Sequence, residues 1–253
     1  MSLWSVLLVL VASLATLSSA ADSDYCKLCK QNPRCLYKEN TPGKACKNYK
    51  GPNLSASDEQ LIVRLHNEYR NKVALGKETR GKNGHAQPSA SNMRKLSWDN
   101  ELATNAQRVA DQCVFEHSTC TNTIDGTPAG ENLLTGGFAV GQTGPDWNAT
   151  VYAWYEEVDL RDGRLNTKPF VADSTFEDVG HYTQMCWGET YGIGCGYSMY
   201  TAGSGSKIDT HLVVCHYKAL GNNEGQAMYK AGKPATQCAS GTKRDSAFLG
   251  LCA

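Results

Sequence analysis

The stretch of the chain that decides the fold is GHYTQMCWGETYGIGCGYSMYTAGSGSKIDTHLVVCHY, residues 180–217. Three short runs within it, 181–187, 193–199 and 211–217, are rich in aromatic and β-branched residues, and clusters of Gly and Ser separate them. Such runs are typical of short β-strands bounded by turns. We therefore predict an antiparallel sheet of a few strands in this part of the chain.

Three amphipathic helices are predicted upstream of these strands. The first begins with a capping box at residues 57–60 and continues to about Leu75, with apolar residues at helical spacing. The second and third are expected at residues 100–113 and 149–158. Because helices and strands segregate along the chain rather than alternating, the pattern favours the α+β class over a doubly wound fold.

The two ends differ from the central domain, which we place at residues 55–219. Residues 1–20 contain no charged side chain and end in small residues, which predicts a secretory signal peptide cleaved after Ala20 or Ala21. Residues 21–54 are polar and Cys-rich and predict a loop-like N-terminal extension, and residues 220–253 form a polar tail with two cysteines. No other stretch is apolar enough to span a bilayer, so we expect a secreted, extracellular protein.

Composition restricts the choice of partners and compartment. The chain carries 25 basic and 25 acidic side chains in 253 residues. This balance, without any Lys/Arg-rich run, argues against nucleic acid or an anionic membrane as a partner. All 11 cysteines follow the predicted cleavage site, which indicates structural disulfides in an oxidising compartment. Two sequons predict a glycoprotein modified at Asn53 and Asn148.

Four titratable residues are candidates for chemistry: His117, Glu131, Glu157 and His181. Taken singly, each fits an ordinary role, since a lone Glu on a helix is usually a solvated charge and a lone His is usually structural. Sequence spacing does not bring the four together. The chain has no His-Glu-x-x-His motif, phosphate-binding loop or nucleophile elbow, so a hydrolase triad has no support.

Taken in order, several motifs resemble the CAP superfamily, which comprises cysteine-rich secretory proteins, antigen 5 and plant pathogenesis-related proteins. They are HNEYR at 66–70, LSWDNELA at 96–103, GEN at 130–132, GHYTQMCW at 180–187 and HLVVCHY at 211–217. The loop ETRG at 78–81 and the tail from 229 to 252 are similar to arthropod antigen 5, the venom-allergen and salivary branch. The resemblance implies a three-layer α-β-α sandwich with helices on both faces of an antiparallel sheet.

The resemblance also implies a large cleft in which His117, Glu131, Glu157 and His181 converge. In the family the two His typically bind a metal ion, while the two Glu act through water or orient the ligands. Two imidazoles among carboxylates suit Zn²⁺ or Cu²⁺. Because only neutral His binds a metal, affinity should fall below about pH 6.

A disulfide framework is implied in the same way. The expected pairs are Cys26–Cys35, Cys29–Cys120, Cys46–Cys113, Cys195–Cys215 and Cys238–Cys252, each stabilising the fold by roughly 2–4 kcal/mol. Cys186 is left over. We interpret it as a small buried hydrophobe in a monomer, and the alternative is a thiol through which a dimer forms.

Three classes of function stay open. The first is a secreted salivary or venom protein that binds host proteins or small lipids without catalysis, and it is our main expectation. The second is a metal-binding protein that uses copper at the His/Glu site to dismute superoxide. The third is a protease, which is remote because Ser118 and Thr183 lie beside candidate site residues but show no sign of activation.

Overall fold

The computed structural model describes residues 22–51, 54–139, 142–201 and 208–253. A four-stranded mixed sheet forms its middle layer, in the order β1 (Ser97–Trp98), β3 (Gly192–Thr201), β4 (Ile208–Lys218) and β2 (Gly130–Ala139). The β3–β4 and β4–β2 pairs are antiparallel, and β1 runs parallel to β3. The predicted α+β class and three-layer sandwich are thus confirmed, but the prediction of a purely antiparallel sheet is wrong at β1.

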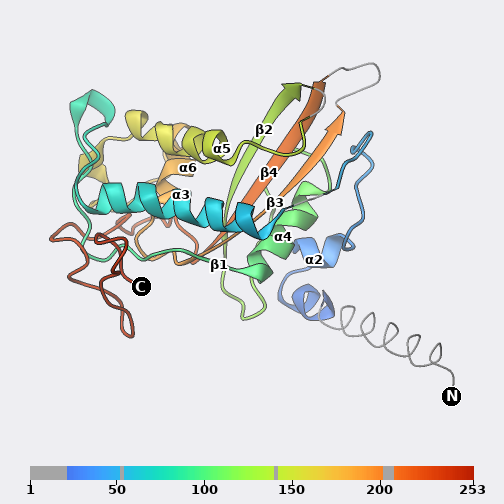
Figure 1. Ribbon diagram of the computed structural model, residues 1–253. Coiled ribbons are helices and arrows are strands. Elements are labelled where there is room, and N and C mark those ends of the chain that lie inside the picture. The colour runs from blue at the N-terminus through green and yellow to red at the C-terminus, as the bar shows by residue number, and fades with distance from the viewer. Residues whose placement is uncertain (1–21, 52–53, 140–141, 202–207) are drawn as a thin grey trace.

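Helices cover both faces of the sheet (Figure 1). Helix α4 (Asn100–Ala110) packs on β3 and β4 from one side, with the short α2 (Pro33–Leu36) outside it. Helices α3 (Ala56–Ala74), α5 (Trp147–Tyr155) and α6 (Phe176–Met185) form the other layer. Short 3-10 turns η1 (Lys82–Gly84), η2 (Glu156–Leu160) and η3 (Gly163–Leu165) connect these elements. Among the described residues, no helix is long and apolar enough to cross a membrane.

Strand β4 contributes side chains to two hydrophobic clusters, one on each face of the sheet. Val213, Cys215 and Tyr217 face the larger cluster beneath α3, α5 and α6. Leu212 and Val214 face the smaller cluster beneath α4. Alternate side chains of a strand point to opposite faces, so covering both faces buries nearly every residue of the run.

One predicted strand is wrong, because residues 181–187 belong mainly to helix α6. His, Tyr and Thr favour strands when a short window is judged by propensity. Over the longer window from Phe176, however, the buried residues Val179, Tyr182 and Cys186 repeat at helical spacing. The helix buries this stripe against α5, and tertiary packing therefore overrides the local β preference.

Boundaries shift at the other predicted elements. The capping box of α3 uses Ser55 and Asp58 rather than beginning at Ser57, and α4 ends at Ala110 after its cap at Asp99. Helix α5 covers 147–155 and continues as the 3-10 turn η2. Strands β1 and β2 were not predicted. The N-terminal extension is more ordered than a loop, since residues 22–28 are helical and precede α2.

Four of the five expected disulfides are formed: Cys26–Cys35, Cys46–Cys113, Cys195–Cys215 and Cys238–Cys252. The fifth pairing is wrong for this structure, where Cys29 and Cys120 are free thiols. They are nevertheless neighbours, because burial and a hydrogen bond with Cys29 raise the pKa of the Cys120 thiol. The fold therefore places the two cysteines next to each other.

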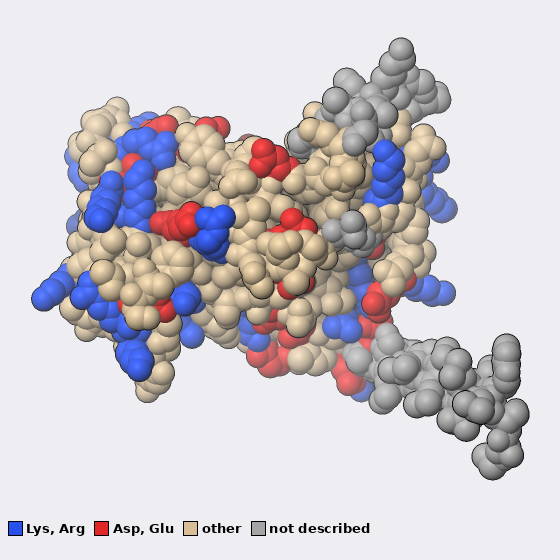
Figure 2. Space-filling model, viewed as in Figure 1, with Lys and Arg blue, Asp and Glu red and all other residues tan. Residues whose placement is uncertain are grey.

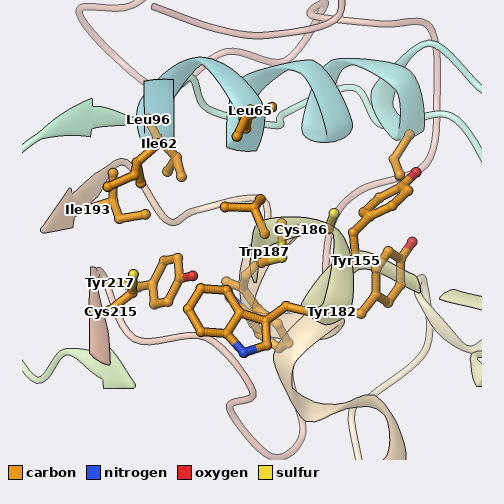
Figure 3. Packing of buried hydrophobic residues seen from close by; sticks show 14 of the residues in the cluster. Ile62, Leu65, Leu96, Tyr155, Tyr182, Cys186, Trp187, Ile193, Cys215 and Tyr217 are labelled. Atoms are coloured by element: carbon orange, nitrogen blue, oxygen red, sulfur yellow. The ribbon is translucent and has the colours of Figure 1, made fainter. Parts of the chain in front are cut away.

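Cys186 is fully buried in the larger core, and Figure 3 shows it beside Trp187 beneath helix α3. Burial raises the pKa of its thiol to about 12. A thiol in this position is inert and cannot reach a second chain while the domain is folded. Its interpretation as a buried hydrophobe is confirmed, and this burial gives no support to the alternative of a dimer through Cys186.

Candidate functional site

A cleft of about 670 Å³ lies over the first residues of β2, the edge strand of the sheet. Its walls come from the loop that follows α4, from α6 and from residues 220–222. Three of the four candidate residues line it: His117, Glu131 and His181. The cleft is therefore assembled around β2, an element that the sequence analysis did not predict.

The first wall carries a histidine–glutamate pair. His117 lies on the loop after α4, close to the point where Cys113 is bonded to Cys46. Its Nδ1 is 2.8 Å from Oε1 of Glu131 at the start of β2. A carboxylate only accepts hydrogen bonds, so Nδ1 is the donor and the neutral ring keeps its lone pair on Nε2. The hydrogen bond to Glu131 raises the pKa of His117, with burial opposing it.

Glu131 is nearly buried and accepts four hydrogen bonds. Oε1 accepts from His117 and from the Ser118 backbone N–H, and Oε2 accepts from the Ser118 hydroxyl and from His216. Burial alone would raise the pKa of Glu131, but its hydrogen bonds with His117, His216 and Ser118 hold the pKa well below the usual range. A carboxylate so fully bonded orients its neighbours and has little capacity left to bind a metal itself.

The opposite wall carries a second histidine–glutamate pair. His181 on α6 places Nδ1 2.6 Å from Oε1 of Glu157 in η2, and Oε2 of Glu157 accepts the Tyr182 backbone N–H at 2.9 Å. The indole of Trp154 stacks on the His181 ring with centroids 6.1 Å apart. The ring is therefore fixed on one edge by a carboxylate and on one face by a tryptophan.

A third histidine, His216 on β4, supports the first pair and was missed in the sequence. It lies directly opposite Glu131 in the register of β2 and β4, and its Nε2 is 2.9 Å from Oε2 of Glu131. The side chain is fully buried, and Nδ1 has no hydrogen-bond partner among the described residues. In the sequence, only the alternation within the run 211–217 could have indicated which face of the sheet the His216 side chain lies on. Its partner could not be identified without β2.

The donor set fits a divalent metal ion in part. Both rings donate Nδ1–H to a carboxylate, which is the arrangement that orients metal-binding histidines in proteins and leaves Nε2 available. Within the described residues, however, no three His, Cys, Asp or Glu side chains converge as a ready-made metal cluster. The four predicted residues therefore form two separate pairs around one cleft, and a metal would have two protein ligands with open positions left for water or a ligand.

The hydroxyls near the site are engaged elsewhere. Ser118 donates to Oε2 of Glu131 at 2.7 Å, and Thr183 donates to the carbonyl of Val179 at 3.0 Å. A serine or threonine nucleophile needs a base that accepts its proton, and a histidine usually fills that role. Neither hydroxyl is bonded to His117 or His181, whose Nδ1 atoms face carboxylates.

Of the two predicted glycosylation sites, Asn148 lies within the described residues. Asn148 is exposed in the first turn of α5, where Asp146 caps the helix. Its position is accessible to a glycan, and its glycosylation stays a prediction. Asn53 lies outside the described residues, as does the predicted signal peptide.

Comparison with known proteins agrees with the geometry. The model of the cysteine-rich secretory protein family, CAP, matches residues 63–217. The chain is 37% identical to venom allergen 3 of Solenopsis invicta over 233 residues, covering 90% of this chain and 97% of that protein. Among solved structures, BmVAL-1 matches with a TM-score of 0.64 and 29% identity over 80% of this chain and 96% of its own. NaASP2, crystallised with Zn²⁺, matches with a TM-score of 0.60 and 28% identity over 85% of this chain and 100% of its own.

Proposed function

Because the chain belongs to the cysteine-rich secretory protein family, CAP, we propose that it is a secreted, antigen 5-like protein that binds a small amphipathic ligand in the cleft at β2. Similarity to venom allergens supports a venom or salivary origin. The four disulfides support an extracellular environment, where such bonds persist. A signal peptide at residues 1–20 is part of this proposal.

The observation that carries the proposal is the mixed lining of the cleft. Phe115, Phe176 and Leu220 provide apolar lining, and His117 and His181 provide polar groups on its two walls, each ring bonded to a carboxylate. Small-molecule sites are commonly concave and mostly apolar, with a few polar groups that set the ligand's orientation. A small lipid with an anionic or hydroxyl head group matches this distribution. The engaged hydroxyls of Ser118 and Thr183 favour binding over covalent catalysis.

Ligand binding is tested with dansyl-undecanoic acid, a fluorescent fatty-acid analogue. We expect saturable binding that weakens at least about tenfold in Phe115→Asp, because a charge replaces an apolar wall. Leu249→Asp is the matched control, since Leu249 is about as exposed but lies in the tail, outside the cleft. Equal affinities for the wild type and both variants would place the bound probe elsewhere.

A metal ion at the same cleft is a second candidate, favoured by the two Nδ1–carboxylate pairs. Nε2 of His117 and of His181 would hold Zn²⁺ or Cu²⁺, while Glu131 and Glu157 orient the rings. A bound metal would supply a Lewis acid or, with copper, a redox centre. Superoxide dismutation depends on copper binding and stays a prediction. The Zn²⁺ in the NaASP2 crystal structure supports testing this candidate.

Metal content is measured on untagged protein after exposure to Zn²⁺ or Cu²⁺ and dialysis at pH 7.5 and pH 5. We expect about one ion per chain at pH 7.5 and loss at pH 5, because protons compete for imidazole near its pKa. Glu131 raises the pKa of His117, so this competition begins at a higher pH than for a free imidazole. The double variant His117→Ala, His181→Ala should bind no metal, whereas His85→Ala, outside the cleft, should bind as the wild type does. Retention of metal by the double variant would rule out this site.

A further inference from the structure

One end of the molecule carries a concentration of basic side chains, which we call the basic end. Figure 2 shows Lys and Arg gathered at the side where the C-terminal tail lies in Figure 1. The basic end is made of the following residues: Lys77, Arg94, Lys95, Lys230, Lys233, Lys243 and Arg244. None of them lines the cleft at β2.

The fold brings these residues together from three parts of the sequence. Cys252 forms backbone bridges with both Arg94 and Arg244, so the chain at 94–95, at 243–244 and at 252–253 lies side by side. A further bridge joins Ala90 to Ala231 and places Lys230 and Lys233 next to the same segment. The Ala90 backbone N–H also donates to the carbonyl of Ala74, three residues before Lys77. The disulfide Cys238–Cys252 closes the tail over this arrangement. The grouping is therefore held by backbone contacts and a covalent bond.

The basic end carries more positive than negative charge. Two acidic side chains lie at or beside it: Asp245, which pairs with Lys95 at 2.8 Å, and the exposed Glu189, which accepts a hydrogen bond from Asn92. In the described parts of the chain, the other six cations form no ion pair. Lys77, Lys230, Lys233, Lys243 and Arg244 are exposed. Since the whole chain has zero net charge, the positive excess here is balanced by acidic side chains elsewhere on the molecule.

We propose that the basic end binds a sulfated polysaccharide of the heparan sulfate type. Several cations spread over irregular backbone suit a linear polyanion that can contact them in succession. A membrane surface is less suitable, because such binding usually uses an amphipathic helix with an apolar face. The tail has no helix, and Leu249 is its one exposed large hydrophobic residue. The choice of an extracellular polyanion rests on the proposed secretion, but the surface itself does not depend on the cleft.

The test is binding to a heparin-derived dodecasaccharide, measured by biolayer interferometry at about 0.15 M NaCl and at higher salt. We expect the wild type to bind, with affinity falling steeply as salt rises. The variant Lys230→Glu, Lys233→Glu, Lys243→Glu, Arg244→Glu should bind roughly a hundredfold more weakly, because four exposed contacts become repulsive. A second variant with Ala at the same four positions should show an intermediate loss, and circular dichroism checks that both variants are folded.

The matched control is Lys30→Glu, Lys38→Glu, Lys44→Glu, Lys47→Glu, which changes the net charge equally at four exposed lysines of the N-terminal extension. It should retain binding, as should the cleft variant His117→Ala, His181→Ala. Desulfated heparin should not bind. The proposal is overturned if the wild type does not bind, if both Glu variants lose binding equally, or if phosphatidylserine vesicles or single-stranded DNA compete better than heparin. If the cleft binds neither the fatty-acid probe nor a metal while heparin binding persists, the proposed function is rejected and the proposal for the basic end stands.

Discussion

Individual buried polar residues show how this fold satisfies groups that water no longer reaches. Arg70 is fully buried, and its guanidinium donates to the backbone carbonyls of Arg94, Met185, Trp187 and Thr190. These hydrogen bonds join α3 to the segment before β1, to the end of α6 and to the turn before β3. Burial lowers the pKa of Arg70 to about 10, so the group stays charged at neutral pH.

His66, one helical turn before Arg70, predicts a pH dependence of stability. Burial lowers its pKa to about 4, and the ring stays neutral between Ile62 O and the Tyr217 hydroxyl. In the unfolded chain its pKa is near 6.5, so the unfolded state takes up a proton first as the pH falls. Stability is therefore complete above about pH 6.5 and falls by about 3 kcal/mol between pH 6.5 and pH 4.

Urea unfolding at several pH values checks this prediction. The part of the slope between pH 6.5 and pH 4 that comes from His66 should disappear in His66→Gln. His85→Gln should keep the slope, since His85 lies on a partly exposed loop. If His66→Gln keeps the full slope as well, other groups are responsible for the acid sensitivity.

At the scale of elements, the contact between α4 and β3 depends on glycines at alternate positions of the strand. A Cβ on Gly194 would lie 2.1 Å from the backbone N of Ala103, and one on Gly196 would lie 2.4 Å from the Cα of Gln107. These are backbone atoms of α4, which cannot rotate away as a side chain can. The helix therefore packs directly on the bare strand, and this close approach brings α4 to the position from which His117 follows.

Gly194→Ala should therefore destabilise the protein by about 3 kcal/mol, because α4 would have to move off the sheet. Gly192→Ala is the control on the same strand, since its Cβ would contact Lys218 Cβ at 3.4 Å. We expect a change below about 1 kcal/mol for the control. Thermal or urea unfolding measures both, and equal small effects would show that α4 can shift without cost.

At the scale of the whole molecule, zero net charge conceals an uneven distribution of charge. The cleft lies over the edge strand β2, whereas the basic end is built from the tail and the segment before β1. Disulfides fix both regions: Cys46–Cys113 anchors the chain just before His117, and Cys238–Cys252 fixes the tail. Zero net charge argued against nucleic acid or an anionic membrane as a partner, yet folding gathers cations that are distant in sequence onto one surface.

Some features could be predicted because they depend on local pattern or on ordered motifs. Helices α3, α4 and α5 follow from caps and apolar periodicity, and β3 and β4 follow from their β-prone runs between glycines. The family resemblance identified the two histidines and two glutamates. Strand β2 was missed because its sequence, GENLLTGGFA, contains three glycines and lacks regular alternation, and its pairing with β4 stabilises it.

The sequence by itself determined which elements form where periodicity is strong, and its family resemblance proposed four candidate site residues. Tertiary structure alone decided that 181–185 is helical, that His216 supports Glu131, and that the basic residues of 94–95 and 243–244 adjoin. Each of these depends on contacts between segments far apart in the chain, whose register or packing no local pattern specifies. Propensity and periodicity describe one segment at a time, whereas burial and charge grouping are properties of several segments together.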